Sequence, residues 1–398
     1  MGLIESCCIK PDDQIYDDND FTLYEKSIIS SLKNKNKFSR GVTSNVYRIQ
    51  PKKRKLIVKK IKYQYKEHAE KEIKVLKIIK HSSFNKIFFP KLNRILKLSN
   101  AYLIVFENND YTDLFEFIKK RKLKSLFSIK GNEMFDFDEY DEDGNIIPKQ
   151  DDRWMLHQQI KEINSLYIIN QIINGLYQLY LIGYSHLDIK PENVLIKEIS
   201  KEEARSKNLE RYPVIPSHIN KCEHKNKKYY SIKLIDFGSC LPYKDERLLK
   251  YTVGTWGYFA PEIFCDKMYY KSCDMWSVGV ILWQLLTGRQ PFGESAKDYM
   301  SDMINIECIH PIYKYNTTFK TFSFDVQNII RKMFRINPFS RSRVSIMFSN
   351  DIFFKIKVLK NKSDNNSQHG KKRSKSYTNT DEKKKAHDKF KRKIRSTI

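Results

Sequence analysis

The sequence predicts an α+β protein, and three observations support this. Apolar runs typical of strands occur at 56–61 and 101–107, and a segment with helical spacing lies between them at 68–80. In the later part of the chain the main apolar segments have helical spacing, at 163–182 and 276–286. The 398 residues, of which 40% are hydrophobic, are enough for two lobes with separate cores.

One polar stretch, at 186–195, reads His-Leu-Asp-Ile-Lys-Pro-Glu-Asn-Val-Leu and lies between two apolar runs. It brings a carboxylate (Asp188), an ammonium (Lys190) and a carboxamide (Asn193) together within six residues. Phosphoryl transfer uses such a set to orient a hydroxyl, neutralise phosphate charge and hold a metal ion. A polar turn between a helix and a strand is the alternative, which only the surrounding motifs can exclude.

Further motifs follow this stretch at regular distances. The strand-like segment 231–234 leads into Ile-Asp-Phe-Gly at 235–238, and Ala-Pro-Glu follows at 260–262. Taken together, the segments from about 38 to 354 resemble the eukaryotic protein kinase family, in the order and spacing of five separate motifs. The resemblance implies a bilobal fold, with a small β-rich N-lobe that carries one key helix and a larger, mainly helical C-lobe.

The resemblance also implies roles for the residues that match, with ATP and Mg²⁺ as cofactors. Asp188 would orient the substrate hydroxyl and accept its proton, and Lys190 and Lys59 would stabilise phosphate charge. Asn193 and Asp236 would bind two Mg²⁺ ions. The partners implied are protein substrates.

The strand at 56–61 carries two neighbouring lysines, Lys59 and Lys60. Lys59 matches the phosphate-binding lysine of the family, and strand alternation turns one of the two inward and the other outward. Glu72, in the helix predicted over 68–80, matches the glutamate that pairs with this lysine. A solvated glutamate on a lysine-rich helix face is the alternative for Glu72.

Other positions match residues that contact ATP in the family: Ser39, Gly41, Val46, Glu107, Asn109, Asp113 and Leu195. The glycine-rich loop that covers the phosphates departs from the family pattern, because Gly41 alone remains of its three glycines. Ser39 and Ser44 stand where the others would be. Small residues still allow backbone N–H groups to approach phosphates, although less freely than glycine does. An ordinary β-turn would fit the same residues.

Four residues match positions that dock the substrate or support the fold. Thr255 lies in the docking turn, and Thr255 together with Lys190 is the combination of the serine/threonine class. Glu262 is expected to pair with Arg341 near the end of the domain. Asp274 matches the buried aspartate that holds the catalytic loop.

Leu187 is the chief departure from the family, which usually has arginine at this position. That arginine binds the phosphate of the activation segment through a charge-assisted hydrogen bond, which leucine cannot form. Tyr251 and Thr252 are the candidate phosphorylation sites in the segment 236–262. We therefore expect activity that does not require phosphorylation of the activation segment.

The first six residues, Met-Gly-Leu-Ile-Glu-Ser, fit the pattern for N-myristoylation at Gly2. One myristoyl chain binds a membrane only marginally, and the adjacent Cys7 and Cys8 are suited to add palmitoyl groups. The sequence thus predicts a lipid anchor at the cytoplasmic face of a membrane, most simply the plasma membrane. The polar segment that follows reads as a tether, with a short helix around 21–32.

The residues from 355 onward contain 16 Lys or Arg against four Asp or Glu, and few are apolar. This composition predicts a disordered basic tail. Its clusters at 371–376 and 389–395 suit an anionic membrane surface, and phosphorylation of Ser374 or Ser376 would weaken that attraction. A solubilising tail is the alternative.

The whole chain carries a net charge of +26, which bears on partners such as anionic membranes, nucleic acid or acidic proteins. Phe390 is the one aromatic side chain within the basic clusters at 371–376 and 389–395, too few for stacking on bases, which argues against nucleic acid. The seven cysteines contain no C-x-x-C pair and indicate reduced thiols of a cytosolic protein. No apolar run reaches the length that spans a bilayer.

Two insertions depart from the family, at about 121–160 and 197–230. The first is acidic, and 139–150 partly imitates a calcium loop, but Gln150 stands at the twelfth position instead of glutamate. An acidic surface loop is therefore the better interpretation. In the second insertion, Cys222 and His224 lack partner ligands for a metal site.

These observations divide the chain as follows: 1–34, acylated tether; 35–109, N-lobe; 110–355, C-lobe with the two insertions; 356–398, basic tail. The predicted function is an ATP-dependent serine/threonine protein kinase. One alternative is a catalytically weak pseudokinase that recruits partners to a membrane, which the altered glycine loop favours. Another is a small-molecule phosphotransferase, which the docking segment at 255–262 disfavours. The sequence assigns no subfamily, substrate or oligomeric state.

Overall fold

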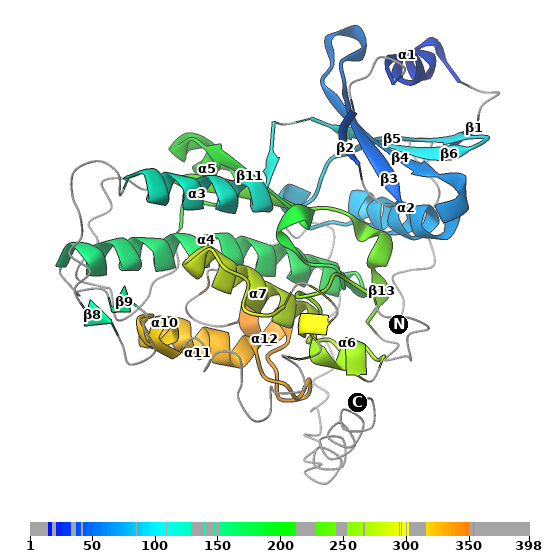
Figure 1. Cartoon of the computed structure of the whole chain (residues 1–398). Coiled ribbons are helices and arrows are strands. Elements are labelled where there is room, and N and C mark those ends of the chain that lie inside the picture. Colours follow the sequence, from blue (N-terminus) through cyan, green and yellow to red (C-terminus); the bar gives the residue numbers. More distant parts are fainter. Residues whose placement is uncertain are drawn as a thin grey trace, which may run out of the picture. The chain divides into compact units, whose positions relative to one another are not determined.

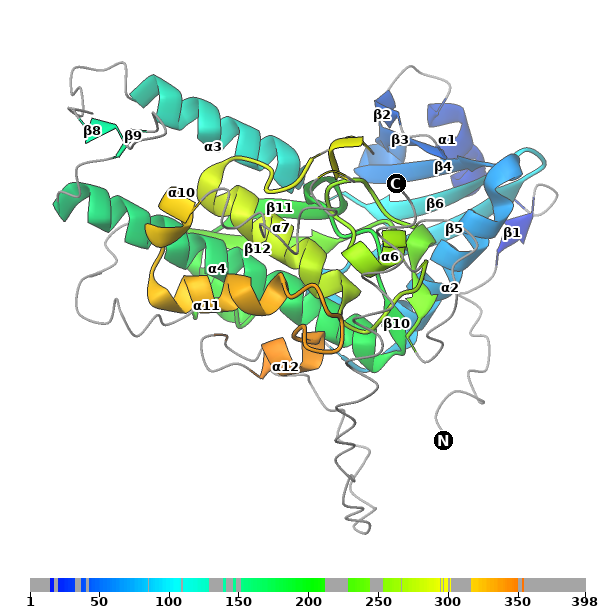
Figure 2. The same ribbon diagram turned by 60° about the horizontal axis from the view of Figure 1, so that its bottom comes forward.

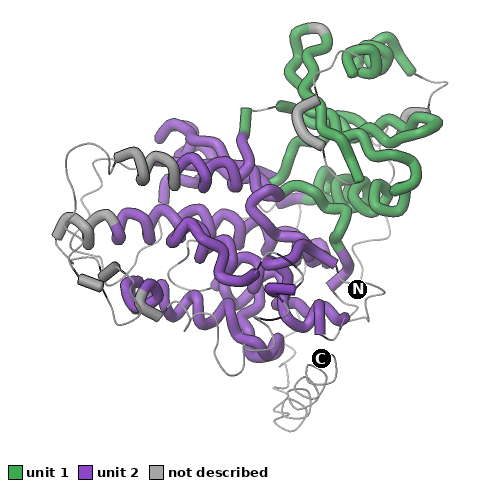
Figure 3. Tube along the Cα trace, in the orientation of Figure 1, with its two compact units in different colours: residues 1–82, 89–111, 235–240 green, residues 83–88, 112–234, 241–398 purple. Residues whose placement is uncertain are grey.

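The computed structural model describes residues 15–17, 21–32, 37–40, 43–84, 86–108, 110–128, 139–140, 146–147, 152–211, 228–243, 253–265, 267–293, 295, 297–299, 301, 316–349 and 353. The chain divides into two compact units (Figure 3). Unit 1 comprises residues 1–82, 89–111 and 235–240, and unit 2 comprises residues 83–88, 112–234 and 241–398. Each unit has its own core.

Unit 1 is built on a six-stranded sheet in the order β1-β5-β6-β4-β3-β2 (Figure 1). β1 pairs with β5 in parallel, and the other neighbours are antiparallel. The predicted strands at 56–61 and 101–107 are confirmed as β4 and β6. The strands are β1 (Tyr16–Asp17), β2 (Lys37–Arg40), β3 (Ser44–Ile49), β4 (Leu56–Lys62), β5 (Leu92–Leu98) and β6 (Ala101–Glu107).

Two helices cover opposite faces of this sheet (Figure 1). Val58 of β4 packs in the same apolar cluster as α1 (Leu23–Ser31). Lys59, the next residue along β4, contacts Glu72 of α2 (Lys66–His81). Because successive side chains of a strand point to opposite faces, α1 and α2 lie on either side of β4.

The helix α1 is part of the core of unit 1, so residues 21–32 of the range 1–34, which was predicted as a tether, belong to the folded unit. Phe21 and Ile28 are buried against apolar side chains of the sheet. Glu25 is fully buried, and its Oε1 accepts a hydrogen bond of 2.6 Å from Arg94 of β5. The helix itself was predicted, but its burial depends on β5, which is remote in sequence.

Unit 2 is mainly helical, and its main helices lie side by side in two views (Figures 1 and 2). α7 packs against both α4 and α11, and α12 packs against α4. All residues of α7 from Cys273 to Leu286 are buried, which confirms the predicted core helix. The helices are α3 (Leu114–Ser128), α4 (Asp152–Leu181), α5 (Lys201–Ser206), α6 (Pro261–Cys265), α7 (Cys273–Thr287), α10 (Asn316–Lys320), α11 (Phe324–Met333) and α12 (Val344–Phe348).

Short strands of unit 2 position the polar stretch 186–195. β11 (Val194–Ile199) starts directly after Asn193 and pairs with β12 (Tyr229–Leu234) and β7 (Thr112–Asp113). On the other side of the stretch, β10 (Tyr184–Ser185) pairs with β13 (Leu241–Pro242). The stretch is therefore fixed by a sheet at each end. The short 3₁₀ turns are η3 (Pro51–Lys53), η4 (Tyr63–Tyr65), η5 (Lys86–Phe88), η6 (Pro191–Asn193) and η8 (Phe237–Ser239).

The predicted insertions contain more regular structure than expected. α3 continues to Ser128 and α4 begins at Asp152, so both helices extend into the range 121–160. Neither extension contains glycine or proline, so nothing in it interrupts a helix. The segment that imitates a calcium loop includes a hairpin of β8 (Glu139–Tyr140) and β9 (Ile146–Ile147), and its carboxylate side chains lie outside the described residues.

Among the residues described, no helix combines the length and the apolar character needed to cross a bilayer. The acylation residues Gly2, Cys7 and Cys8 lie outside the described residues, as do Cys222, His224 and the basic tail from 356 onward with Ser374 and Ser376.

Candidate active site

In unit 1, a buried ion cluster joins β4, α2 and the Asp-Phe-Gly turn. The ammonium of Lys59 lies 3.0 and 2.8 Å from the two carboxylate oxygens of Glu72 and 2.8 Å from Oδ1 of Asp236. Lys59 is 7% exposed and Glu72 1%. The predicted pair of Lys59 with Glu72 is present. Lys60, the alternative, follows Lys59 in β4 and is only half-buried.

Lys59 and Asp236 are held in their charged forms, whereas burial raises the pKa of Glu72. Burial alone would lower the pKa of Lys59, but the carboxylates of Glu72 and Asp236 outweigh this effect and raise it. Burial alone would raise the pKa of Asp236, but Lys59 and, to a lesser extent, His68 hold it well below its usual range. Asp236 thus remains an anion although its surroundings exclude much of the water.

In unit 2, three polar side chains meet around the carboxylate of Asp188. The hydroxyl of Thr255 donates to Oδ1 of Asp188 over 2.7 Å, and the ammonium of Lys190 donates to the same hydroxyl over 2.7 Å. Lys190 also lies 3.3 Å from Oδ2 of Asp188. The Nδ2 group of Asn193 donates to the backbone carbonyl and Oδ2 of Asp188, at 2.8 and 3.0 Å.

The donor chemistry of Asn193 and Asp236 fits a hard divalent cation. The nitrogen of the Asn193 carboxamide is engaged with Asp188, so its oxygen is the atom that remains for a cation. At Asp236 the contacts of Lys59 and His68 involve Oδ1. Carboxylate and carboxamide oxygens are the ligands that Mg²⁺ and Ca²⁺ prefer.

Asp274 holds the backbone at the start of the polar stretch. Its two carboxylate oxygens accept the N–H groups of His186 and Leu187, each over 2.8 Å. Leu187 has a φ of 65°, a left-handed conformation that leucine rarely adopts. Such strain persists only where the surroundings impose it, and here two charge-assisted hydrogen bonds to a buried aspartate do so.

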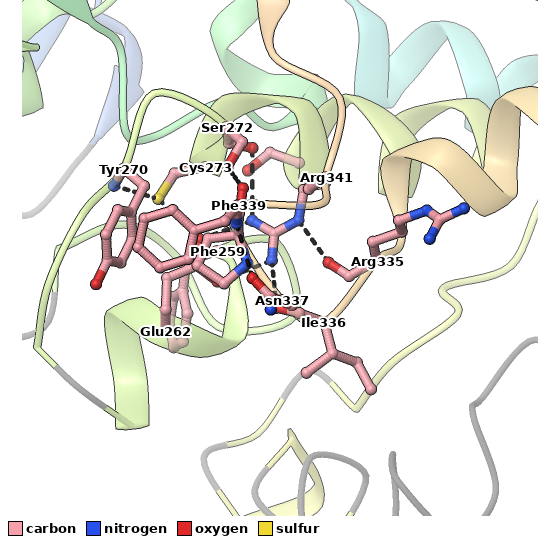
Figure 4. Close-up of polar contacts among 12 residues, drawn as sticks. Phe259, Glu262, Tyr270, Ser272, Cys273, Arg335, Ile336, Asn337, Phe339 and Arg341 are labelled. Carbon is pink, nitrogen blue, oxygen red and sulfur yellow. Dashed lines mark hydrogen bonds and ion pairs between the residues drawn. The ribbon is translucent and has the colours of Figure 1, made fainter. Parts of the chain in front are cut away.

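Glu262, at the end of the docking segment 255–262, forms the predicted ion pair with Arg341 (Figure 4). The two guanidinium nitrogens lie 2.7 and 2.8 Å from the two carboxylate oxygens, and both side chains are fully buried. Arg341 also donates to the carbonyls of Arg335 and Ile336, at 2.8 and 3.0 Å. The thiol of Cys273 lies 3.1 Å from Glu262. The pair links α6 to the segment that precedes α12.

The remaining predicted ATP-contacting residues are divided between the units. In unit 1, Val46 of β3 lies opposite Lys59 in the sheet register, and Glu107 ends β6, with its carboxylate 2.9 Å from Lys91. In unit 2, Leu195 lies opposite Asp113, whose Oδ1 accepts the N–H of Glu116 at the start of α3. Ser39 lies in β2. Other predicted site residues lie outside the described residues: Gly41, Asn109, Tyr251 and Thr252.

His68 belongs to the cluster of unit 1 but was not singled out in the sequence. Its Nε2 lies 3.6 Å from Oδ1 of Asp236. The available signal was its spacing, because His68 precedes Glu72 by one helical turn and therefore shares its helix face.

Comparison with known proteins agrees with this geometry. The family model for the protein kinase domain matches residues 138–353, more than half of the chain. The probable serine/threonine-protein kinase KCC4 of Saccharomyces cerevisiae is 27% identical over 51% of the chain and 17% of its own length. Calcium-dependent protein kinase 4 of Plasmodium falciparum is 27% identical over 58% of the chain and 31% of its own length.

A third relative, the serine/threonine-protein kinase dkf-1 of Caenorhabditis briggsae, is 31% identical over 38% of the chain. The matches cover between 17% and 31% of the lengths of these three relatives. Because the family match spans most of unit 2, including the Asp188 and Glu262 clusters, the chain belongs to the protein kinase family.

Proposed function

We propose that this chain is an ATP-dependent serine/threonine protein kinase. The observation that carries the proposal is the contact of Asp188 and Lys190 through the hydroxyl of Thr255. Lys190 and Thr255 are the serine/threonine combination of the family, and here the two side chains are in direct contact. Two of the relatives are named a probable serine/threonine-protein kinase, KCC4, and a serine/threonine-protein kinase, dkf-1.

The chemistry follows from the two clusters. The oxygen of a substrate serine or threonine attacks the γ-phosphorus of ATP, and the bond between that phosphorus and the bridging oxygen of ADP breaks. The carboxylate of Asp188 orients the attacking hydroxyl and takes its proton. Lys190 and Lys59 supply positive charge that stabilises the phosphate oxygens during transfer.

Asn193 and Asp236 would hold Mg²⁺, which supplies charge neutralisation at the phosphates when it is bound. Lys59 keeps Asp236 ionised before any cation arrives, because an ammonium at 2.8 Å favours the carboxylate form. Glu72 in turn holds Lys59 in place from α2.

The direct experiment is transfer of labelled phosphate from ATP to a generic basic protein by the purified full chain. Acid hydrolysis of the product should yield phosphoserine and phosphothreonine and no phosphotyrosine. Phosphotyrosine would contradict the serine/threonine assignment. Nucleotide binding without any transfer would instead favour the pseudokinase scaffold.

We further propose that activity does not depend on phosphorylation of the activation segment. Leu187 offers no charge for a phosphate, and Asp274 already fixes its backbone. Contacts to an aromatic ring hold the start of the activation segment instead. The Tyr243 ring stacks on Tyr180 with centroids 4.6 Å apart, and Lys271 lies 5.2 Å from the ring centroid.

A Tyr251→Phe/Thr252→Ala double variant tests this proposal. We expect its kcat to stay within about twofold of wild type, because the proposal gives no role to a phosphate at either position. Steady-state kinetics on the basic protein substrate give the value. Thr255→Ala is the matched control in the same segment and should lose activity, because Thr255 contacts Asp188 and Lys190. Near-total loss of activity in the double variant would contradict the proposal.

We also propose that the protein is tethered to the cytoplasmic face of a membrane by lipid on Gly2 and on Cys7 or Cys8, with the basic tail as a second contact. Seven residues separate Cys8 from Tyr16, the first residue of β1. Even a fully extended chain of this length spans only about 25–30 Å. The anchor would therefore hold unit 1 close to the membrane surface.

Gly2→Ala should move the protein from the membrane pellet to the supernatant in cells that contain an N-myristoyltransferase. The reason is that the first acyl group brings the cysteines to the membrane where the second is added. Cell fractionation with an immunoblot measures the distribution. A Cys7→Ser/Cys8→Ser variant, which keeps one acyl chain, should divide between the two fractions. Unchanged pelleting of Gly2→Ala would count against the anchor.

A further inference from the structure

His68 lies against the Asp-Phe-Gly turn in unit 1. Its Nε2 is 3.6 Å from Oδ1 of Asp236, the oxygen that also receives the ammonium of Lys59 at 2.8 Å. The side chain of His68 is 25% exposed, so most of its surface is covered by neighbours. Asp236 has a φ of 65° and a ψ of 74°, a left-handed conformation that surrounding contacts must maintain.

Gly238 shows how closely the imidazole packs on this turn. A Cβ at Gly238 would overlap the ring, and the three nearest atoms to that Cβ all belong to His68. Gly238 does not have a positive φ, so its backbone conformation is open to other residues. The obstacle to a side chain at this position is therefore the imidazole and not the backbone.

We propose that His68 is a positioning residue for Asp236: together with Lys59 it fixes the Oδ1 side of the carboxylate and leaves Oδ2 directed for a cation. The inference rests on the proposed function, in which Asp236 holds the metal of Mg·ATP. Groups behind a ligand commonly determine metal affinity in this way, because they fix the orientation of the ligating atom.

A metal site made by His68 itself is the competing interpretation. Ligand atoms of His68, Glu72 and Asp236 lie within 4.8 Å of one another. However, the ammonium of Lys59 lies 2.8 Å from both carboxylates and would face any cation bound among them. Like-charge repulsion in a buried site opposes that arrangement, so we assign His68 to positioning.

The test measures cation binding directly. Electron paramagnetic resonance reports the dissociation constant of Mn²⁺ for the full chain in the presence of a non-hydrolysable ATP analogue. His68→Leu keeps the bulk without a polar group and should weaken Mn²⁺ binding about tenfold, the lower end of the effect of residues that orient a ligand. His68→Gln, whose amide can reach Asp236, should recover most of the affinity. His81→Leu, an exposed histidine on the same helix, is the matched control.

A second pair of variants uses the steric contact. Gly238→Ala should weaken Mn²⁺ binding because its methyl group displaces the imidazole. The double variant His68→Ala/Gly238→Ala should lose little more affinity than His68→Ala alone, since the ring is already absent. Full additivity of the two losses would overturn the proposal.

Two further results are decisive. Wild-type affinity in His68→Leu overturns the positioning role alone and leaves the kinase assignment intact. A wild-type chain that binds no Mn²⁺ with the nucleotide analogue overturns the proposed function and this inference together.

Discussion

Replacing Asp188 with Asn is expected to reduce kcat for phosphoryl transfer by about 10²- to 10⁴-fold, the contribution of a positioned general base. Each tenfold loss corresponds to about 1.4 kcal/mol of activation free energy. The carboxamide has nearly the same size as the carboxylate and can still accept the hydroxyl of Thr255. It cannot take a proton from the substrate hydroxyl.

Binding of ATP should not change in this variant, because the predicted phosphate-binding side chain, Lys59, belongs to the cluster of unit 1. Rapid-quench kinetics and a fluorescent nucleotide titration separate the two quantities. Asp110→Asn is the matched control, since the Asp110 side chain is exposed and forms a surface ion pair of 3.5 Å with Lys55. A wild-type rate in Asp188→Asn would mean that another group accepts the proton.

Replacing Arg341 with Met is expected to destabilise unit 2 by about 3–5 kcal/mol, the cost of leaving the other member of a buried ion pair as an unpaired charge. Glu262 would remain as a fully buried carboxylate that keeps the hydrogen bond from the thiol of Cys273. The carbonyls of Arg335 and Ile336 would lose donors as well. Unfolding in urea, monitored by fluorescence, gives the change in free energy.

Two controls make this result specific. A Glu262→Leu/Arg341→Met double variant should recover much of the loss, because no buried charge remains. Removing the exposed pair of Lys228 and Glu198 by Lys228→Ala should change stability by less than about 1 kcal/mol, since both groups are largely in water. If Arg341→Met cost no more than Lys228→Ala, the ion pair would not be a main support of the fold.

The sequence predicted the parts of the site that depend on local pattern. The family resemblance pointed to Lys59, strand alternation turns only one of Lys59 and Lys60 inward, and the structure places Lys59 beside Glu72. The family resemblance also implied the pair of Glu262 with Arg341, although the two residues are 79 positions apart. In both cases the residues are a buried acid and a buried base that stabilise each other, so identifying one of them predicts its partner.

What the sequence did not predict depends on contacts between distant segments. The burial of α1 depends on the sheet of unit 1, because Phe21 and Ile28 pack on its apolar side chains and Glu25 pairs with Arg94, 69 residues further along the chain. The position of His68 beside Gly238 depends on how α2 packs on the Asp-Phe-Gly turn. A single histidine on an amphipathic helix gives no indication of this packing, because many neighbours are compatible with it.

The packing of α1 also decides where the folded protein can be truncated for expression. A polypeptide that began at residue 35 would lack Phe21 and Ile28. The apolar sheet residues that pack against them, Ile49, Leu56 and Val58, would then be exposed to water. Such an apolar face in water promotes aggregation. A soluble recombinant fragment of this protein therefore has to begin before Phe21.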